Sequence, residues 1–170
     1  MGETKTLPSL RDELAETLGT VRDAMTSDVI AVAPDVSVSE AVMLFERAGV
    51  AGGPVVESDQ VIGVVTVRDL VQRGGRTQAT GPFLRPPRGQ PEWTVRDVMT
   101  RGVVAARPFW PLIEATLVMD EVRVNRLPVV DDTGKAVGIL ARDDVLRALA
   151  RAVRSEDEAG ADPRPLLPPD

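Results

Sequence analysis

Thr66 and Asp69 are the residues whose types and spacing best support ligand chemistry. They follow a predicted strand, Val61–Val65, and stand where a predicted helix begins. A helix N-terminus offers unpaired N–H groups and a partial positive charge, which favour a phosphate group. A carboxylate there can accept hydrogen bonds from a ribose diol, as acidic residues do in dinucleotide sites. Gly63, late in the strand, would let a ligand approach the backbone closely.

The same Thr-x-x-Asp spacing is also a plain helix-capping pattern. It occurs three times in this chain, at Thr20/Asp23, Thr66/Asp69 and Thr94/Asp97. Spacing alone therefore leaves two interpretations of the middle pair open, a structural cap and a ligand contact, and one carboxylate can serve as both.

Composition narrows the chemistry further. The 170 residues include no Cys and no His, which excludes disulfides, thiolate metal sites, Cys nucleophiles and the commonest general base. Two carboxylates could still do acid–base work, but no nucleophile–base pair can be written. We therefore predict that the protein is not an enzyme and requires no cofactor.

Charge and hydropathy limit the partners. The net charge of −6 makes nucleic acid an unlikely main partner, because duplex binding needs a basic face. No apolar run approaches the ~20 residues that span a bilayer, and the polar N-terminus lacks a signal-peptide core. We expect a cytoplasmic protein without a membrane partner.

An internal repeat organises the chain. Residues 20–26 read TVRDAMT and residues 94–100 read TVRDVMT, an offset of 74 residues. Ordered matches continue, and one inserted residue in a later turn shifts the offset to 75. The matched pairs include Pro34 with Pro108, Glu40-Ala41 with Glu114-Ala115, Pro54-Val55-Val56 with Pro128-Val129-Val130, Gly63 with Gly138, and Asp69 with Asp144. This period fits two copies of a small domain.

Each copy predicts the element order strand, helix, strand, strand, helix, which makes the fold class α+β. The first strands are predicted at Val29–Ala33 and Val103–Ala106, each ending near a proline. The first helix of copy one has a capping box at Ser37/Glu40 and a stop at Gly49, and that of copy two begins at Pro111. The hairpins turn at Ser58-Asp59 and near Gly134, and the closing helices carry Leu70 and Val145.

The repeat and the composition together predict five segments. These are a helical segment at 1–19, capped by Ser9 and ended by Gly19; a first domain at 20–71; a Gly/Pro/Arg-rich linker at 72–92; a second domain at 93–154; and a disordered acidic, Pro-rich tail at 155–170.

Residues 20–154 resemble a tandem pair of CBS domains, the family named for the regulatory part of cystathionine β-synthase. Four motifs carry the resemblance, each present twice or nearly so: the leading VRD-x-M-T, a helix start with Glu-Ala, the Pro-Val-Val strand, and a close of the form Gly-x-x-Thr-x-x-Asp, in which copy two has Ala141 at the Thr position. The resemblance implies two β-α-β-β-α repeats packed through their sheets with pseudo-twofold symmetry. It also implies two clefts for an adenosine-containing ligand (AMP, ADP, ATP or S-adenosylmethionine), and a homodimer.

The resemblance also implies site residues beyond Thr66, Asp69 and Asp144. An adenine slot would be lined by Val29, Ile30, Gly53 and Pro54 in copy one and by Val103, Val104, Leu127 and Pro128 in copy two. Arg68, Arg126 and Arg142 are candidate phosphate contacts, and each also fits an ordinary solvated surface charge. Ala141 stands where copy one has Thr66, so copy one is the better candidate site.

Two functions follow from these features. The first is a stand-alone regulatory module that senses an adenosine-containing ligand and acts on a separate effector protein. The alternative is a ligand-free, dimerising protein-interaction module, favoured by the missing threonine of copy two and by the Arg/Pro-rich linker.

Overall fold

The structure, a computed structural model, describes residues 9–74, 92–102 and 104–160. Most of the predicted linker, the last ten residues of the predicted tail and the candidate residue Val103 lie outside this part of the chain.

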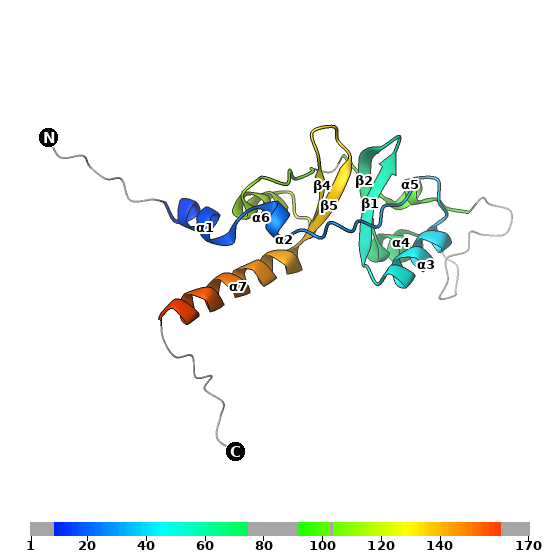
Figure 1. The fold of residues 1–170 in the computed structure, drawn as a ribbon. Helices are drawn as coiled ribbons and strands as arrows, with labels where there is room; N and C mark the ends of the chain where they lie inside the picture. Colours follow the sequence, from blue (N-terminus) through cyan, green and yellow to red (C-terminus); the bar gives the residue numbers. More distant parts are fainter. Residues whose placement is uncertain (1–8, 75–91, 103, 161–170) are drawn as a thin grey trace, which may run out of the picture.

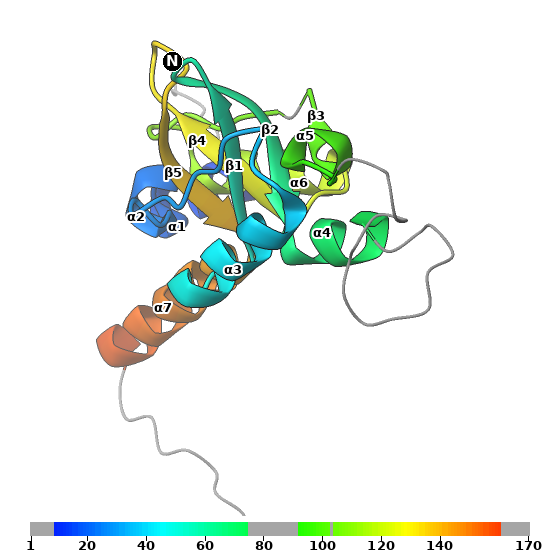
Figure 2. The same cartoon turned by 90° about the vertical axis from the view of Figure 1, so that its right-hand side faces the viewer.

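Two β-hairpins stand side by side in the middle of the molecule (Figures 1 and 2). Strands β1 (Gly52–Glu57) and β2 (Gln60–Thr66) form the first hairpin, and β4 (Arg126–Val130) and β5 (Ala136–Ala141) form the second, both antiparallel. Strand β1 contacts β5, and β2 contacts β4. The predicted α+β class, with two repeats packed through their sheets, is confirmed.

Helices cover both sides of the paired hairpins (Figure 1). On the side of β1 and β2 lie α3 (Val38–Ala48), α4 (Val67–Gly74) and α5 (Val95–Val98). On the side of β4 and β5 lie α1 (Leu10–Leu18), α2 (Val21–Ala24) and α6 (Leu112–Glu121), with α7 (Arg142–Gly160) extending away below them.

Helix α3 forms as its local sequence predicts. The Ser37 side chain accepts a hydrogen bond from the Glu40 N–H, and the Glu40 carboxylate accepts one from the Ser37 N–H, both at 3.2 Å. Gly49 ends the helix in the left-handed conformation, with φ 66°. Val38, Ala41 and Phe45 recur on one face and are buried in the core of the first half.

The prediction that each copy begins with a regular strand is wrong. Among the described residues of these two segments, only Val32 and Ala106 pair, each in an isolated parallel bridge, to Val55 and Val129 respectively. The Val32 N–H donates to the Pro54 carbonyl and its carbonyl accepts from Val56. Pro34 and Pro108 then follow within two residues and have no N–H to extend the ladder.

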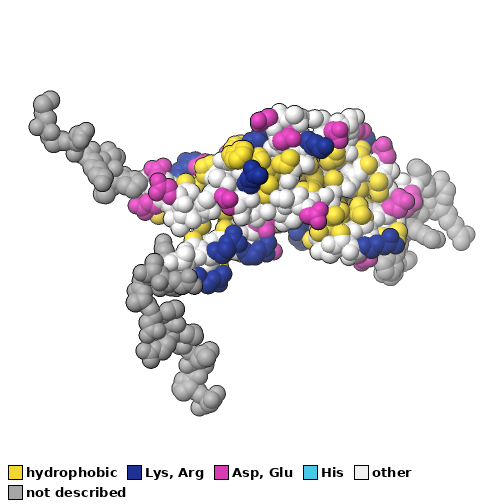
Figure 3. All heavy atoms as spheres, in the orientation of Figure 1, with side chains coloured by type: hydrophobic (Ala, Val, Ile, Leu, Met, Phe, Trp, Pro, Cys, Tyr) yellow, Lys and Arg dark blue, Asp and Glu magenta, His cyan; other side chains and the backbone are white. Residues whose placement is uncertain are grey.

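Helix α7 is longer than predicted. The disordered tail was expected from Ser155, but the helix continues to Gly160, because the Ser-Glu-Asp-Glu-Ala stretch contains neither proline nor an early glycine. Helix α4 likewise extends three residues into the predicted linker, to Gly74. Basic side chains gather over α7 (Figure 3).

The short segments 20–26 and 94–100, which we call the lead segments, pack against the opposite copy. Val21 is fully buried in the core of the second half, and Val95 and Val98 are buried in the core of the first. The Val21 N–H donates to the Trp110 carbonyl, and the Val95 N–H donates to the Val36 carbonyl, both at 2.9 Å. These contacts repeat at the offset of the sequence repeat, so the exchange is reciprocal and pseudo-twofold.

Gly63 and Gly138 make room for the exchanged segments. A Cβ on Gly63 would lie 2.6 Å from the Thr100 carbonyl oxygen, and one on Gly138 would lie 2.5 Å from the Met25 sulfur. Thr100 belongs to β3 (Thr100–Arg101), which pairs with β2. The prediction that Gly63 lets a ligand approach the backbone is therefore wrong, because the other lead segment occupies that space.

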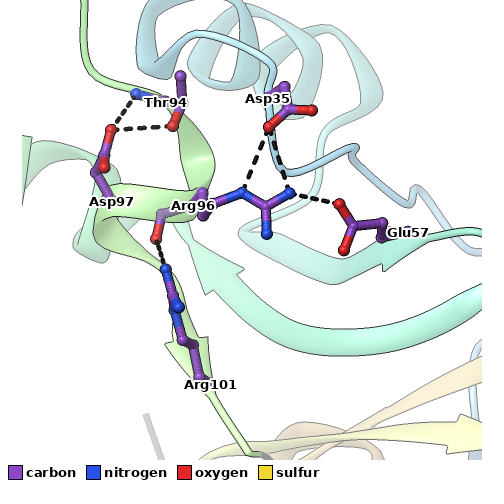
Figure 4. Close-up of polar contacts among 6 residues, drawn as sticks. All are labelled: Asp35, Glu57, Thr94, Arg96, Asp97 and Arg101. Carbon is purple, nitrogen blue, oxygen red and sulfur yellow. Dashed lines mark hydrogen bonds and ion pairs between the residues drawn. The ribbon is translucent and has the colours of Figure 1, made fainter.

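Arg96 ties one lead segment to the first half (Figure 4). Its guanidinium pairs with Asp35, at 3.4 Å, and with Glu57. Asp35 precedes α3 and Glu57 ends β1, so one side chain joins three segments. Exposed ion pairs of this kind contribute little to the free energy of folding. We therefore expect the Arg96 pairs to orient α5 rather than to stabilise it.

We predict that Val21→Ala and Val95→Ala each lower the free energy of unfolding by about 2 kcal/mol, because each removes two buried methyl groups and leaves a cavity. Denaturant unfolding measures this. Val71→Ala, on a half-exposed side chain of α4, is the matched control and should change stability by less than ~0.5 kcal/mol. An unchanged stability in Val21→Ala would contradict the exchange.

Asp23 should make stability depend on acidic pH. Hydrogen bonds from the Thr20 hydroxyl and the Thr20 backbone N–H hold the pKa of Asp23 below its ordinary value. A lowered pKa in the folded state gives stabilisation that is present above about pH 4 and is lost as the pH falls through the folded pKa. Asp23→Asn should therefore melt below the wild type at neutral pH, and the gap should narrow from about pH 5 to pH 3. A constant gap would argue against this linkage.

Candidate functional site

A cleft of about 430 Å³ opens between the two copies where α4 begins. We call it the first cleft. Its described lining comes from β2 and the start of α4, from β3, from the residue before β1, and from the loop after α6 together with the first residue of β4. The residues are Ala51, Val64, Thr66, Val67, Arg68, Asp69, Thr100, Arg123, Val124, Asn125 and Arg126.

Thr66 and Asp69 form a helix cap at the wall of this cleft. One carboxylate oxygen of Asp69 accepts the Thr66 N–H at 3.0 Å and the Thr66 hydroxyl at 2.6 Å. The Thr66 hydroxyl oxygen in turn accepts the Asp69 N–H at 3.2 Å. The structural interpretation of this pair therefore holds, and the lone pairs not used by the cap leave the carboxylate able to accept a diol.

Three arginines line the first cleft, among its described residues. Arg68 and Arg123 are exposed, and Arg126 is half-buried and donates to the Ala51 carbonyl at 2.9 Å. Arg123 has a φ of 56°, a left-handed conformation that costs a non-glycine residue about 1 kcal/mol or more. It occupies the position after α6 that Gly49 occupies after α3.

A smaller cleft of about 170 Å³, the second cleft, lies across the pseudo-twofold axis from the first. Ala141 and Asp144 stand in it where Thr66 and Asp69 stand in the first. The rest of its described lining consists of Thr26, Asp28, Val29, Ile30, Val50, Ala51, Gly52, Gly53, Pro54, Arg126, Ile139, Asp143 and Arg147.

The Asp144 carboxylate is already paired with groups of its own copy. Its side chain is only 4% exposed, accepts the Ala141 N–H at 2.7 Å, and forms an ion pair with Arg147. Arg147 lies one turn further along α7 and is 63% exposed.

The structure assigns the predicted site residues to the two clefts differently from the sequence prediction. Val29, Ile30, Gly53 and Pro54 were expected beside Thr66 and Asp69, but they line the second cleft with Asp144. The cause is the exchange, which pairs Thr26 with Ile139 of β5 and so brings the chain after it to the second half. Gly53 leaves room for the chain itself, since a Cβ there would lie 2.1 Å from the Ile30 carbonyl oxygen.

The described copy-two slot residues lie outside the described linings of both clefts. Leu127 and Pro128 are buried, with Leu127 in the core of the second half, and Val104 is exposed. Arg142 is exposed at the start of α7, where its backbone N–H donates to the Asn125 carbonyl. None of these four belongs to the described linings of the two clefts, and Val103 lies outside the described residues.

Sequence reasoning missed seven polar lining residues: Thr26, Asp28, Thr100, Arg123, Asn125, Asp143 and Arg147. Thr26 and Thr100 match between the copies, whereas the signal of the other five was a difference between the copies. Arg123 aligns with Gly49, Asn125 with Ala51, and Arg147 with Gln72. Looking for matches finds the repeat, whereas these positions are visible only as mismatches.

The described residues show neither a metal cluster nor a membrane helix. No group of three or more His, Cys, Asp or Glu side chains among them could hold a metal ion. Nor does any helix in the described part of the chain have the length and apolar character needed to cross a bilayer.

The sequence model of the CBS domain matches residues 21–75 and 95–151. The chain therefore belongs to the CBS-domain family, as a tandem pair. The CBS domain-containing protein YhcV of Bacillus subtilis is 33% identical over 144 residues, which cover 85% of this chain and 92% of that protein.

Solved structures share the fold. The Arabidopsis thaliana protein CBSX2, solved in complex with AMP, is 31% identical with a TM-score of 0.62, and the match covers 79% of this chain and 98% of that one. The CBS domain pair of protein MJ0100, solved with 5′-methylthioadenosine and S-adenosyl-L-methionine, has a TM-score of 0.66. That match covers 78% of this chain and 97% of the other, and at 22% identity it supports the fold alone.

Other relatives are much longer than the match. Inosine-5′-monophosphate dehydrogenase of Methanocaldococcus jannaschii is 32% identical over 139 residues, or 81% of this chain. The match spans 25% of that enzyme, so the likeness concerns the CBS pair and not the whole dehydrogenase.

Proposed function

We propose that this CBS pair is a regulatory module that senses an adenosine-containing ligand bound in the first cleft. The observation that carries the proposal is the composite lining of that cleft. The Asp69 carboxylate comes from one copy, and Arg123 and Arg126 come from the other. A ligand that contacts both would link the two copies.

The chemistry of the lining suits such a ligand. The carboxylate of Asp69 accepts hydrogen bonds from a ribose diol, and the guanidinium groups attract phosphate. Val64, Val67 and Val124 supply apolar surface for a base. A volume of about 430 Å³ lies within the usual range for small-molecule sites, about 300–1,000 Å³.

The relatives support the ligand class. CBSX2, which was solved with AMP, shares 31% of its sequence with this chain over nearly its whole length. A regulatory output through a separate effector protein, and a cytoplasmic location, complete the proposal.

Ligand binding should raise the melting temperature. In a panel of AMP, ADP, ATP and S-adenosylmethionine, a ligand at about 100 times its dissociation constant should stabilise the fold by about 2.7 kcal/mol. Asp69→Ala should abolish this stabilisation. No shift with any member of the panel would refute the proposal.

The matched control is Asp97→Ala. Asp97 caps α5 as Asp69 caps α4, accepting the Thr94 N–H and the Thr94 hydroxyl at 2.9 Å each. It lies outside the described linings of both clefts. Both variants lose a cap at a similar cost, about 1 kcal/mol, but only Asp97→Ala should keep the full ligand response.

A homodimer is the second part of the proposal, and it is shared with the alternative of a ligand-free interaction module. Leu146, Leu149 and Val153 recur on one face of α7 and are 62%, 44% and 52% exposed. Leu117 of α6 is also 47% exposed. Apolar side chains gathered on an outer helix favour contact with another protein surface, and a second copy supplies an identical face.

Leu149→Glu should therefore convert a dimer into a monomer, because it places a charge in the apolar contact. Analytical ultracentrifugation measures the change. Arg151→Glu is the control, since Arg151 lies on the opposite face of α7, and it should leave the dimer intact. A wild-type monomer, or a dimer that survives Leu149→Glu, would contradict this assignment.

A further inference from the structure

The two clefts carry opposite charge, although they arose as copies. Among its described residues the first cleft has three arginines (Arg68, Arg123 and Arg126) and one carboxylate, Asp69. The described lining of the second cleft has three carboxylates (Asp28, Asp143 and Asp144) beside Arg126 and Arg147. A phosphate group is attracted to the first lining and repelled by the second.

The capping carboxylates of the two clefts also differ in their partners. Asp144, the counterpart of Asp69, is buried and paired with Arg147. The counterpart of Arg147 in copy one is Gln72, which carries no charge. Asp69 thus keeps its carboxylate for a ligand, whereas the carboxylate of Asp144 is satisfied by an arginine of its own helix.

The lining of the second cleft also lacks the groups that suit a nucleotide. Ala141 replaces the hydroxyl of Thr66, so the Asp144 carboxylate receives a backbone N–H but no hydroxyl from that position. The cleft measures about 170 Å³, below the ~300 Å³ at which small-molecule sites begin.

Arg123 points to the same asymmetry. Its left-handed conformation is costly for any side chain, and copy one uses Gly49 at the matching position, with φ 66°. Glycine would serve α6 at lower energy. The guanidinium at the first cleft supplies a reason for an arginine at a position where the fold favours glycine.

We infer that each chain binds one phosphate-bearing adenosine ligand, in the first cleft, and that Arg147 occupies the second cleft as a built-in substitute for a ligand. This inference rests on the proposed function, since it assigns the ligand class and the stoichiometry of the same module. The phosphate is recognised by Arg68, Arg123 and Arg126.

Isothermal titration with adenosine and with ADP tests the ligand class and the stoichiometry. ADP should bind to one site per chain, at least about tenfold more tightly than adenosine, because charge-assisted contacts to phosphate are added. The ADP affinity should fall between about 0.05 and 0.5 M salt, while the adenosine affinity stays nearly constant. Two equal ADP sites in the wild type, or equal affinities for the two compounds, would overturn the inference.

Arg123→Gly separates binding from folding. The variant should be at least as stable as the wild type, because glycine adopts the left-handed conformation without strain. Its affinity for ADP should fall about tenfold or more, and its affinity for adenosine should change little. A variant that keeps the wild-type ADP affinity would remove Arg123 from the site.

The double variant Ala141→Thr/Arg147→Gln gives the second cleft the residues of the first at these positions. We expect adenosine titration to detect a second, weaker site per chain, because the freed Asp144 carboxylate can accept a ribose diol while Asp28 and Asp143 still disfavour a phosphate. If this folded variant still binds one adenosine, Arg147 does not block the second cleft and that part of the inference fails. If the wild type binds neither compound nor any member of the ligand panel, both the inference and the proposed function fail. Two equal sites would refute the inference alone and would leave the proposed function intact.

Discussion

The reciprocal exchange of the lead segments is the constraint on which the rest of the structure depends. Each half buries a valine that belongs, in sequence, to the other copy: Val21 in the second core and Val95 in the first. Burying a valine side chain stabilises a fold by about 1.5–3 kcal/mol, a large fraction of the stability of a small domain. Neither copy therefore completes its core alone, and the tandem pair is the unit that folds.

The exchange also explains why each cleft draws on both copies. Thr26 pairs with β5 and lines the second cleft, beside Asp144 of the other copy. Thr100 pairs with β2 and lines the first cleft, beside Asp69 of the other copy. Arg126 lies near the axis and lines both clefts, whereas its counterpart, Gly52, has no side chain. The backbone of the pair is close to symmetric, and the side chains at its centre are not.

Local rules let the sequence predict most of the fold. The capping box at Ser37/Glu40, the left-handed stop at Gly49 and the turn at Ser58-Asp59 each depend on neighbouring residues, and each appears as expected. The exchange could not be predicted this way, because both copies carry the same patterns and either copy satisfies them equally well. Gly63 shows the consequence: its lack of a side chain was correctly noticed, but the close neighbour is Thr100 and not a ligand.

The capping carboxylates were predictable because the copies agree there, whereas Arg123 and Arg147 were missed at positions where the copies differ. Asp69 and Asp144 align and are capping carboxylates in both clefts, so agreement identifies the ancestral geometry without saying which copy uses it. The positions where the copies differ indicate which copy binds a ligand, because the fold itself requires only the shared core residues to be the same in both copies. Gly49 adopts the left-handed conformation without strain in one copy, while Arg123 holds the same, costly conformation in the other. Strain that the fold does not require, placed at the edge of the larger and more basic cleft, is the physical argument that supports the proposed ligand contact there.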